Sequence, residues 1–174
     1  MQAGDSQELT SPSIPRTMIT FQAHGMRFNY RVAGVILHHG RVLCQYETER
    51  HFWFLPGGRA ELGESSLESI RREILEELGV EPRIERMLFL HEMFYSFFGE
   101  PHHELGFYFL LSLPDDASMY DKDTFTLEES SEHIMLTYSW LPLEQLETLP
   151  LYPTFLQKAL LNLPEETQHI ISTE

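Results

Sequence analysis

Cysteine is almost absent from this chain of 174 residues: Cys44 stands alone, so no disulfide can form within the chain. It lies in an apolar strand pattern, which predicts a buried thiol in a reducing compartment rather than a nucleophile. Long apolar runs are also missing, since residues 32–37 and 105–111 form the longest ones, whereas a helix that crosses a bilayer needs about 20 apolar residues. The N-terminus shows neither the basic start nor the apolar core of a secretory signal. We therefore expect a cytoplasmic protein without a membrane-spanning segment.

Basic residues are scarce, with 12 against 27 acidic ones and a formal net charge of −15. Residues 100–174 contain only Lys122 and Lys158 against 14 acidic residues, and no arginine follows Arg86. Such a surface repels a nucleic-acid backbone, which argues against non-specific binding to DNA or RNA. An anionic substrate would have to be held by a metal ion or by arginines of the first half.

The length fits one domain with a single core, and the 42% of hydrophobic residues are ordinary for a globular protein. Residues 1–17 are polar, contain Pro12 and Pro15, and have no apolar period, so we expect a flexible tail there. Residues 18–174 are expected to form the single domain.

Alternating apolar patterns predict strands, and they are interleaved with helical patterns. This order indicates an α/β domain with a mixed sheet. The histidine pairs His38-His39 and His102-His103 are expected in exposed turns, and residues 114–133 in an acidic, irregular loop. Strands are predicted over residues 28–37, 41–46, 86–98, 104–113 and 134–141, and helices over residues 143–149 and 153–163.

The strongest local signal is a helix that begins after Ser65. Ser65 and Glu68 have the spacing of a capping box, in which each side chain binds the other residue's backbone amide. Gly79 follows the last apolar position, where a left-handed residue commonly ends a helix. Four apolar side chains recur at helical spacing and are expected to form one buried stripe: Leu67, Ile70, Ile74 and Leu78.

Three glutamates of this helix, Glu73, Glu76 and Glu77, are expected on one side of it, pointing away from the core. Their mutual repulsion is relieved if a divalent cation binds among them, and an oxygen-only donor set suits Mg²⁺ or Mn²⁺ better than Zn²⁺. Taken alone, a glutamate-rich helix face is usually just solvated. The spacing of the whole segment, from the glycines before the helix to its end, favours a metal site.

The segment from residue 58 to residue 80 resembles the Nudix box of the Nudix hydrolase family, and it departs from that motif at no fixed position. The resemblance extends over about residues 28–163 and implies a Nudix-type α/β/α sandwich with a mixed β-sheet. It also implies hydrolysis of a diphosphate bond in a nucleoside diphosphate linked to another group, X. The matching residues are Gly58-x5-Glu64-x7-Arg72-Glu73-Ile74-x-Glu76-Glu77-x-Gly79-Val80.

The resemblance also assigns roles to residues. It implies that Glu73, Glu76 and Glu77 bind Mg²⁺, or Mn²⁺, together with the carbonyl of Gly57, and that Glu64 completes or orients the metal shell. Arg72 should position a glutamate through a salt bridge. Metal ions stabilise the charge that develops on phosphate oxygens and activate the attacking water, so no protein nucleophile is required.

The general base is open between a box glutamate and a later one. Glu76 is the candidate inside the box, and Glu128, Glu129 and Glu132 precede the strand expected at residues 134–141. We favour Glu129 among them. An exposed acidic loop is the simpler interpretation of each of the three taken singly.

Substrate phosphates should be bound by arginines of the first half, and Arg31, Arg50 and Arg59 are the main candidates. Relatives specific for ADP-ribose often have a proline about fifteen residues after the box, whereas this chain has Phe94-Tyr95-Ser96 there. The difference disfavours ADP-ribose within this resemblance.

Other functions remain as alternatives. A catalytically silent Nudix-fold module that binds or senses nucleotides would commonly lose box glutamates, and all of them are present here. An RNA-end hydrolase would need a basic path for the strand, and the acidic second half argues against it. We expect a small nucleotide as the partner, and the aromatic strands could form a homodimer interface.

Overall fold

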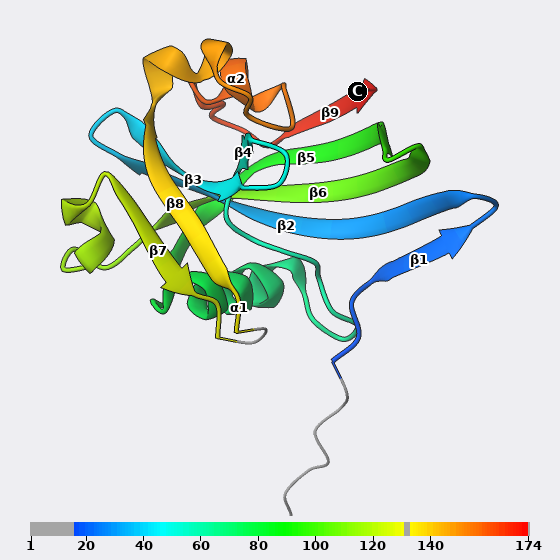
Figure 1. Ribbon diagram of the computed structural model, residues 1–174, viewed down its shortest axis with the longest axis horizontal. Helices are drawn as coiled ribbons and strands as arrows, with labels where there is room; N and C mark the ends of the chain where they lie inside the picture. Colours follow the sequence, from blue (N-terminus) through cyan, green and yellow to red (C-terminus); the bar gives the residue numbers. More distant parts are fainter. Residues whose placement is uncertain (1–15, 131–132, 174) are drawn as a thin grey trace, which may run out of the picture.

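The protein is described by a computed structural model over residues 16–130 and 133–173. A mixed sheet lies between two helical layers, with α1 (Ser66–Leu78) on one face and α2 (Leu156–Ala159) on the other (Figure 1). Two short 3₁₀ helices are η1 (Ser118–Asp121) and η2 (Leu143–Thr148). The strands are β1 (Thr20–Ala23), β2 (Met26–His38), β3 (Arg41–Glu47), β4 (Phe52–Phe54), β5 (Arg83–Phe97), β6 (Glu100–Ser112), β7 (Thr124–Glu128), β8 (Met135–Pro142) and β9 (Gln168–Thr173).

The strands follow the order β7-β8-β3-β2-β6-β5-β9, with β1 beside β2 and β4 beside β3. The pairs β2–β6 and β5–β9 are parallel. The neighbouring pairs β3–β8, β5–β6 and β7–β8 are antiparallel. The expected mixed sheet of an α/β domain is therefore confirmed.

Two core clusters lie on opposite faces of the sheet because side chains alternate along each strand. In β2, Val32 and Ile36 pack in the cluster that contains Ile70 and Ile74 of α1. The intervening Ala33 and Val35 pack in the other cluster, with apolar residues of η2 and α2. Cys44 is fully buried in this second cluster, as expected, and burial raises the pKa of its thiol.

Helix α1 begins and ends where the sequence predicts. Ser65 and Glu68 form both hydrogen bonds of the capping box, and Gly79 adopts a φ of 70° in the left-handed region. One part of the predicted stripe is wrong, because Leu67 is 49% exposed. Leu67 points in nearly the same direction as Ile74 around the helix. Its exposure therefore arises from its place in the first turn, which the core does not cover.

Several elements differ from those expected. The helix predicted over residues 153–163 is reduced to Leu156–Ala159, and residues 114–133 contain η1 and β7 rather than an irregular loop throughout. Strands β1, β4 and β9 were not predicted. They are short or lie at edges, and they form by pairing with longer strands rather than through a strong apolar period of their own. No helix within residues 16–130 and 133–173 is long and apolar enough to cross a membrane.

The loop before α1 runs along the free edge of β2. Strand β1 pairs with the first four residues of β2, and β3 pairs with β2 only at Leu37–Val42 and His38–Arg41, so the middle of β2, residues 30–36, has no strand on that side. The loop fills this place, because the amides of Val32 and Gly34 donate to the carbonyls of Gly58 and Pro56, both at 2.9 Å. This pairing fixes the loop between the sheet and the box helix.

Candidate functional site

The two glycines before α1 permit a close approach between loop, strand and helix. Gly57 has a φ of 131°, and a Cβ atom there would overlap the carbonyl oxygen of Val32. A Cβ atom on Gly58 would overlap the carboxylate of Glu73. The structure therefore brings Glu73 directly against the glycine loop.

Glu77 lies on the buried side of α1, which corrects the expectation that all three glutamates face away from the core. It is 6% exposed, and its Oε2 accepts a hydrogen bond of 3.0 Å from the amide of Gly57. The physical reason is helix geometry, because Glu77 follows Ile70 by seven residues, close to two full turns. Burial, with a further contribution from the charge of Glu73, raises the pKa of Glu77 to about 8.

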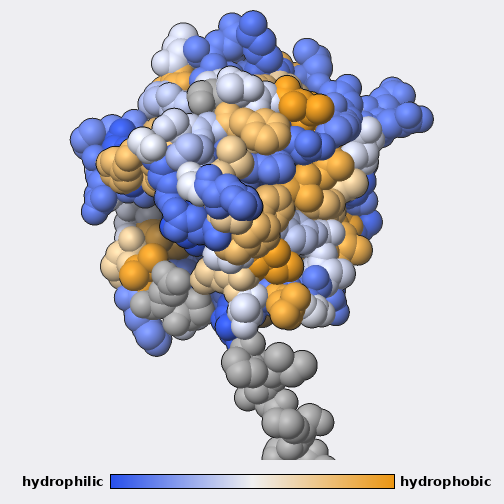
Figure 2. Space-filling view, turned by 90° about the vertical axis from the view of Figure 1, so that its right-hand side faces the viewer, coloured by the Kyte–Doolittle hydropathy of each residue, from blue (hydrophilic) through white to orange (hydrophobic). Residues whose placement is uncertain are grey.

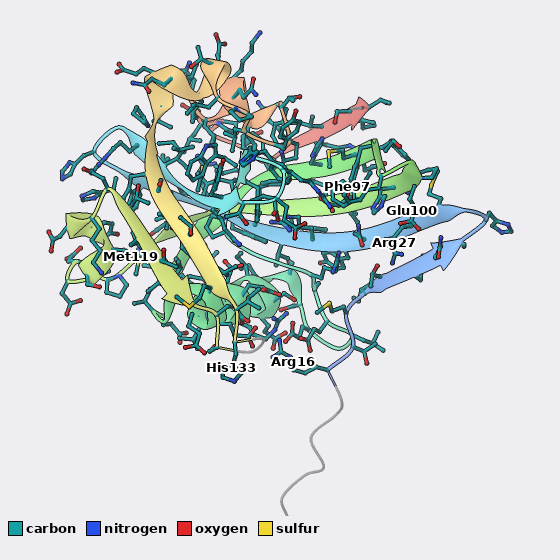
Figure 3. All side chains as sticks on the ribbon, in the orientation of Figure 1. Arg16, Arg27, Phe97, Glu100, Met119 and His133 are labelled. Carbon is teal, nitrogen blue, oxygen red and sulfur yellow. The ribbon has the colours of Figure 1, made fainter. Side chains whose placement is uncertain are left out.

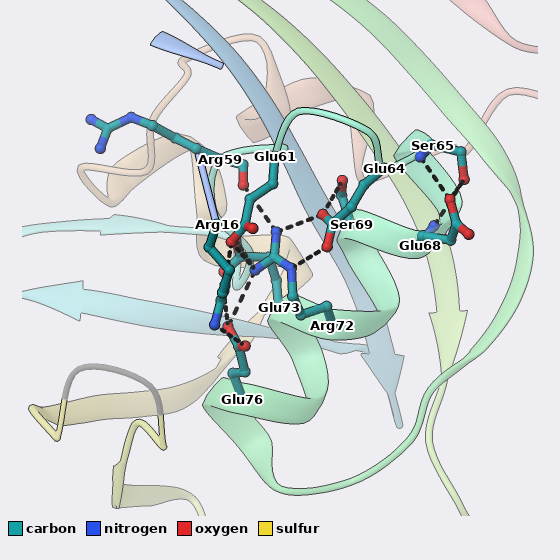
Figure 4. A network of polar contacts seen from close by, with 10 residues as sticks. All are labelled: Arg16, Arg59, Glu61, Glu64, Ser65, Glu68, Ser69, Arg72, Glu73 and Glu76. Atoms are coloured by element: carbon teal, nitrogen blue, oxygen red, sulfur yellow. Dashed lines mark hydrogen bonds and ion pairs between the residues drawn. The ribbon is translucent and has the colours of Figure 1, made fainter. Parts of the chain in front are cut away.

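Arg72 is the centre of a carboxylate network (Figure 4). Its guanidinium donates to Glu64 at 2.9 and 3.0 Å, to Glu73 at 2.8 Å and to Glu76 at 3.2 Å. It also donates to the carbonyl of Arg59 at 3.2 Å. Arg72 thus forms salt bridges with three box glutamates, whereas its positioning role stays a prediction. The hydrogen bonds from Arg72, together with that from the hydroxyl of Ser69, lower the pKa of Glu64.

A second arginine reaches the same network from the N-terminal side of the domain. Arg16 forms ion pairs with Glu61 and Glu76 and lies beside α1 (Figures 3 and 4). The amide of Leu62 donates to the carbonyl of Thr17 at 2.8 Å. Arg16 and Thr17, which the sequence placed in a flexible tail, thus contact the domain, and the rest of that tail lies outside the described residues. No motif spacing indicated either Arg16 or Glu61.

The donor set fits a hard divalent cation. Four carboxylates, those of Glu61, Glu64, Glu73 and Glu76, lie within 3.8 Å of the Arg72 guanidinium. The fifth, Glu77, accepts from the amide of Gly57, and all five provide only oxygen ligands. Burial raises the pKa of Glu73, because the nearby Arg72 offsets only part of the cost of burying this negative charge. In the part of the chain that the structure describes, no three acidic, His or Cys side chains are gathered around a common point for a metal. Arg16 and Arg72 form ion pairs with carboxylates of this set, and the charge of Arg31 acts on Glu73 and Glu77.

The loop that contains Glu129 docks on the second half of α1. Ser130 donates to the carbonyl of Glu76 from its amide at 3.0 Å and from its hydroxyl at 3.2 Å. Glu129 is 6% exposed, and its charge, like that of Glu77, contributes to the raised pKa of the buried Tyr138. The structure thus brings Glu129 close to the box helix, whereas its role as a base stays a prediction.

The other base candidates are placed differently. Glu128 is exposed on β7, and its Oε1 lies 3.0 Å from Nδ1 of His133. Glu132 lies outside the described residues. Glu76, the candidate within the box, is engaged by both arginines of the network.

A pocket of about 670 Å³ adjoins the glycine loop on the sheet face opposite α1. Its lining includes Arg31, Arg50 and Arg59, the three arginines predicted to bind phosphate. Arg31 connects the pocket with the loop, since its Nη2 donates to the carbonyl of Leu55 at 3.2 Å and lies 3.5 Å from that of Gly57. Three arginines thus line the pocket beside two glutamates, Glu47 and Glu104, in a protein that is otherwise strongly acidic.

Arg50 lies farther along the pocket and stacks on aromatic rings. Its guanidinium carbon is 3.7 Å from the ring centre of Phe97 and 4.1 Å from that of Phe98. Phe97 lies toward the end of the sheet where the β5–β6 hairpin turns (Figure 3). Such stacking holds a guanidinium without a carboxylate partner.

Two polar residues that line the pocket, His102 and Glu104, were not predicted there from the sequence. Glu104 is 9% exposed, and its Oε2 lies 3.5 Å from the hydroxyl of Tyr95. His102, expected in an exposed turn, is buried in β6, and its Nδ1 lies 3.4 Å from Nδ2 of Asn29. The turn is displaced because β5 and β6 continue to Phe97 and Glu100. The sequence signal that could have indicated Glu104 is its position as a charged residue in an aromatic-rich strand.

The end of the molecule formed by the β1–β2 and β5–β6 hairpins has apolar patches between charged side chains (Figure 2). Exposed apolar residues of these hairpins are Phe21, Met26 and Phe98. Scattered exposed apolar residues are normal on a protein surface. The homodimer therefore stays a prediction.

The family model of the NUDIX domain matches residues 28–162. No curated protein gives a significant match. Similar solved structures include an ADP-ribose pyrophosphatase from Streptococcus suis 89-1591, with 15% identity, coverage of 83% of this chain and 98% of that chain, and a TM-score of 0.53. A MutT protein from Bacillus halodurans has 21% identity, coverage of 81% and 89%, and a TM-score of 0.54. A UDP-X diphosphatase has 19% identity, coverage of 82% and 66%, and a TM-score of 0.51.

At these identities the likeness to solved structures shows a shared fold, the α/β/α sandwich with a mixed sheet expected from the sequence. The family model extends from β2 to beyond α2 and includes the whole box. The chain belongs to the NUDIX domain family of hydrolases.

Proposed function

We propose that this protein hydrolyses the diphosphate bond of a nucleoside diphosphate linked to another group, X, with the help of a divalent cation. The observation that carries the proposal is the position of the glycine loop. On one side of it lie the carboxylates of Glu73 and Glu77, and on the other side lies the pocket that contains Arg31. A diphosphate held by the arginines would thereby be presented to the carboxylate cluster.

Glu73, Glu76 and Glu77 would hold the cation, with the carbonyl of Gly57, and Glu64 would complete or orient its shell. Mg²⁺ is the first choice for such oxygen ligands, and Mn²⁺ is accepted by similar sites. The cation would supply stabilisation of charge on the phosphate oxygens and would acidify the attacking water. The raised pKa values of Glu73 and Glu77 support this assignment, since burial disfavours their charged forms until a cation compensates them.

The protein's own groups would position the reactants. Arg72 holds Glu64, Glu73 and Glu76 in one network, and Arg31, Arg50 and Arg59 would bind phosphate oxygens. We assign proton removal from the water to Glu129, which is buried and lies next to the box helix. Glu76, Glu128 and Glu132 are the other candidates for this step.

The pocket favours a small nucleotide as substrate. Its aromatic lining, which includes Phe52, Tyr95 and Tyr152, suits a base or another flat group, and the buried Glu104 offers oxygens to hydroxyl or amine donors. The similar structures include an ADP-ribose pyrophosphatase and a UDP-X diphosphatase, so the shared fold does not select one substrate. Tyr95 and Ser96, which replace the proline typical of ADP-ribose relatives, line the pocket and disfavour that substrate.

A module that binds a nucleotide without cleaving it is the alternative function. The pocket would serve both functions equally well. The complete set of box glutamates favours hydrolysis, because these carboxylates are needed for the cation and not for the pocket. Only hydrolysis releases cleavage products from the nucleotide, so product release distinguishes the two functions.

The test is release of phosphate and nucleotide from a panel of nucleoside triphosphates, nucleotide sugars, ADP-ribose, dinucleoside polyphosphates and capped RNA. Each reaction is run with Mg²⁺, with Mn²⁺ and with EDTA. Glu77→Gln is the inactive variant, and Glu81→Gln is the matched control, because Glu81 is exposed and pairs with Arg71 outside the cluster. Metal-dependent cleavage that Glu77→Gln loses and Glu81→Gln keeps supports the proposal. Nucleotide-induced stabilisation without cleavage would instead establish the binding module.

A further inference from the structure

The segment before β1 is fastened to the box loop by its backbone. The amide of Ile19 donates to the carbonyl of Ala60 at 2.8 Å, and the amide of Leu62 donates to the carbonyl of Thr17 at 2.8 Å. Met18 and Glu61 form an antiparallel bridge between these bonds. These contacts place Arg16 at the edge of the carboxylate network.

The guanidinium of Arg16 binds both carboxylate oxygens of Glu76. Its Nη1 lies 2.8 Å from Oε1 and its Nη2 lies 3.1 Å from Oε2, so both oxygens of one carboxylate are engaged in the bidentate geometry that arginine favours. Its Nε binds Oε1 of Glu61 at 2.5 Å. Arg16 therefore provides positive charge at two carboxylates of the cluster.

The two arginines of the cluster differ in how they are held. The side chain of Arg72 is 17% exposed and is also bound by Glu64 and by the carbonyl of Arg59, which makes it part of the frame of the site. The side chain of Arg16 is 49% exposed, although Glu76 beneath it is only 17% exposed. Arg16 thus lies over Glu76 from the solvent side, and its release would leave the contacts of Arg72 with Glu64, Glu73 and Glu76 in place.

We propose that Arg16 competes with the divalent cation for Glu76, so that the N-terminal segment determines the metal concentration at which the site fills. The inference rests on the proposed function, in which Glu76 is a metal ligand. A guanidinium that engages both oxygens of Glu76 places its positive charge where a cation would bind, so the two compete for this carboxylate. Because partly exposed ion pairs are weak, the competition raises the dissociation constant for the metal by about fivefold.

The test measures metal binding directly and needs no turnover. Mn²⁺ is titrated into the full chain, and free Mn²⁺ is followed by its electron paramagnetic resonance signal. Arg16→Gln is compared with Arg71→Gln, which removes the same charge from the same neighbourhood but from an arginine paired with Glu81, at 3.1 Å. Glu76→Gln tests the ligand itself, and melting curves without metal confirm that each variant is folded.

We expect Arg16→Gln to bind Mn²⁺ about fivefold more tightly than the wild type, whereas Arg71→Gln binds it unchanged. Equal or weaker binding by Arg16→Gln overturns the inference, as does equal tightening in both arginine variants, which would show a general charge effect. Wild-type affinity in Glu76→Gln would instead contradict the proposed metal site. The failure of the inference and the failure of the proposed function are thus distinguishable.

Discussion

The amide of Gly57 donates a hydrogen bond of 3.0 Å to Oε2 of Glu77, twenty residues later in the chain. This bond joins the loop before the box helix to the last glutamate of the box. It also holds a buried carboxylate beside Glu73, whose charge contributes to the raised pKa of Glu77. The site therefore combines a loop hydrogen-bonded to β2 and to Glu77 with buried carboxylates whose charge is poorly compensated.

Replacing Glu77 by glutamine should lower the catalytic activity without lowering the stability of the fold. The amide oxygen can still accept the hydrogen bond from Gly57, and the amide is uncharged at every pH. The melting temperature should therefore equal that of the wild type where Glu77 is protonated and exceed it at higher pH. Loss of a metal ligand should lower kcat/KM at least about 100-fold, which corresponds to ~2.7 kcal/mol of transition-state stabilisation. Steady-state kinetics with Mg²⁺ and a melting curve check both parts. Normal turnover would contradict the assigned site.

The stability of the metal-free protein should depend on pH through Glu77. Its pKa is about 8 in the folded state, against an ordinary value of 4.5, so the folded state holds the proton more strongly than the unfolded chain does. The resulting contribution to stability is fully present below pH 4.5 and is lost as the pH rises to about 8. We expect the melting temperature of the wild type, relative to Glu77→Gln, to fall between pH 5 and pH 8.

The same carboxylate should make metal binding depend on pH in the opposite direction. Mg²⁺ binds the ionised form, so the increase in melting temperature on adding Mg²⁺ should grow over the same pH window. Differential scanning fluorimetry of the wild type and of Glu77→Gln at each pH measures both effects. A constant difference between the two metal-free proteins would show that Glu77 does not titrate in this range.

Arg59 offers a test of phosphate binding that leaves the fold intact. Its side chain lines the pocket, and its Nη1 lies 3.9 Å from the sulfur of Met18. Arg59→Gln should raise KM about tenfold through the loss of one charged contact of ~1.4 kcal/mol, with little change in the melting temperature. Arg27→Gln is the matched control, because Arg27 pairs with Glu100 outside the pocket. Equal KM values in the two variants would remove Arg59 from the phosphate site.

Two neighbouring residues of α1 test the orientation of the helix. Ile74 is fully buried, and Ile74→Asp should destabilise the domain by more than about 3 kcal/mol, because an unpaired charge enters the core. Leu75 is 45% exposed, so Leu75→Asp should change the stability by only about 0.5 kcal/mol. Urea unfolding followed by circular dichroism compares them. Similar midpoints would show that the helix is oriented differently.

The sequence by itself determined the local features of the site. The capping box, Gly79 and the buried positions Ile70 and Ile74 specify α1, because these signals act within a few residues of one another. The spacing of the box also indicated the family and, with it, the sandwich fold. Strands with strong apolar alternation were predicted, whereas β7 and β9 were missed, since edge strands form through pairing with a neighbour rather than through their own pattern.

Tertiary structure alone decided which distant groups share the site. Arg31, Arg50 and Arg59 are separated along the chain, and only the folding of β2 with the two loops on either side of β4 gathers them around one pocket. The contact of Arg16 with Glu76 spans 60 residues and follows from the pairing of the N-terminal segment with the box loop. Contacts of this kind depend on how strands and loops pack, and no spacing within the sequence specifies them, because many foldings of the chain would satisfy the same local signals.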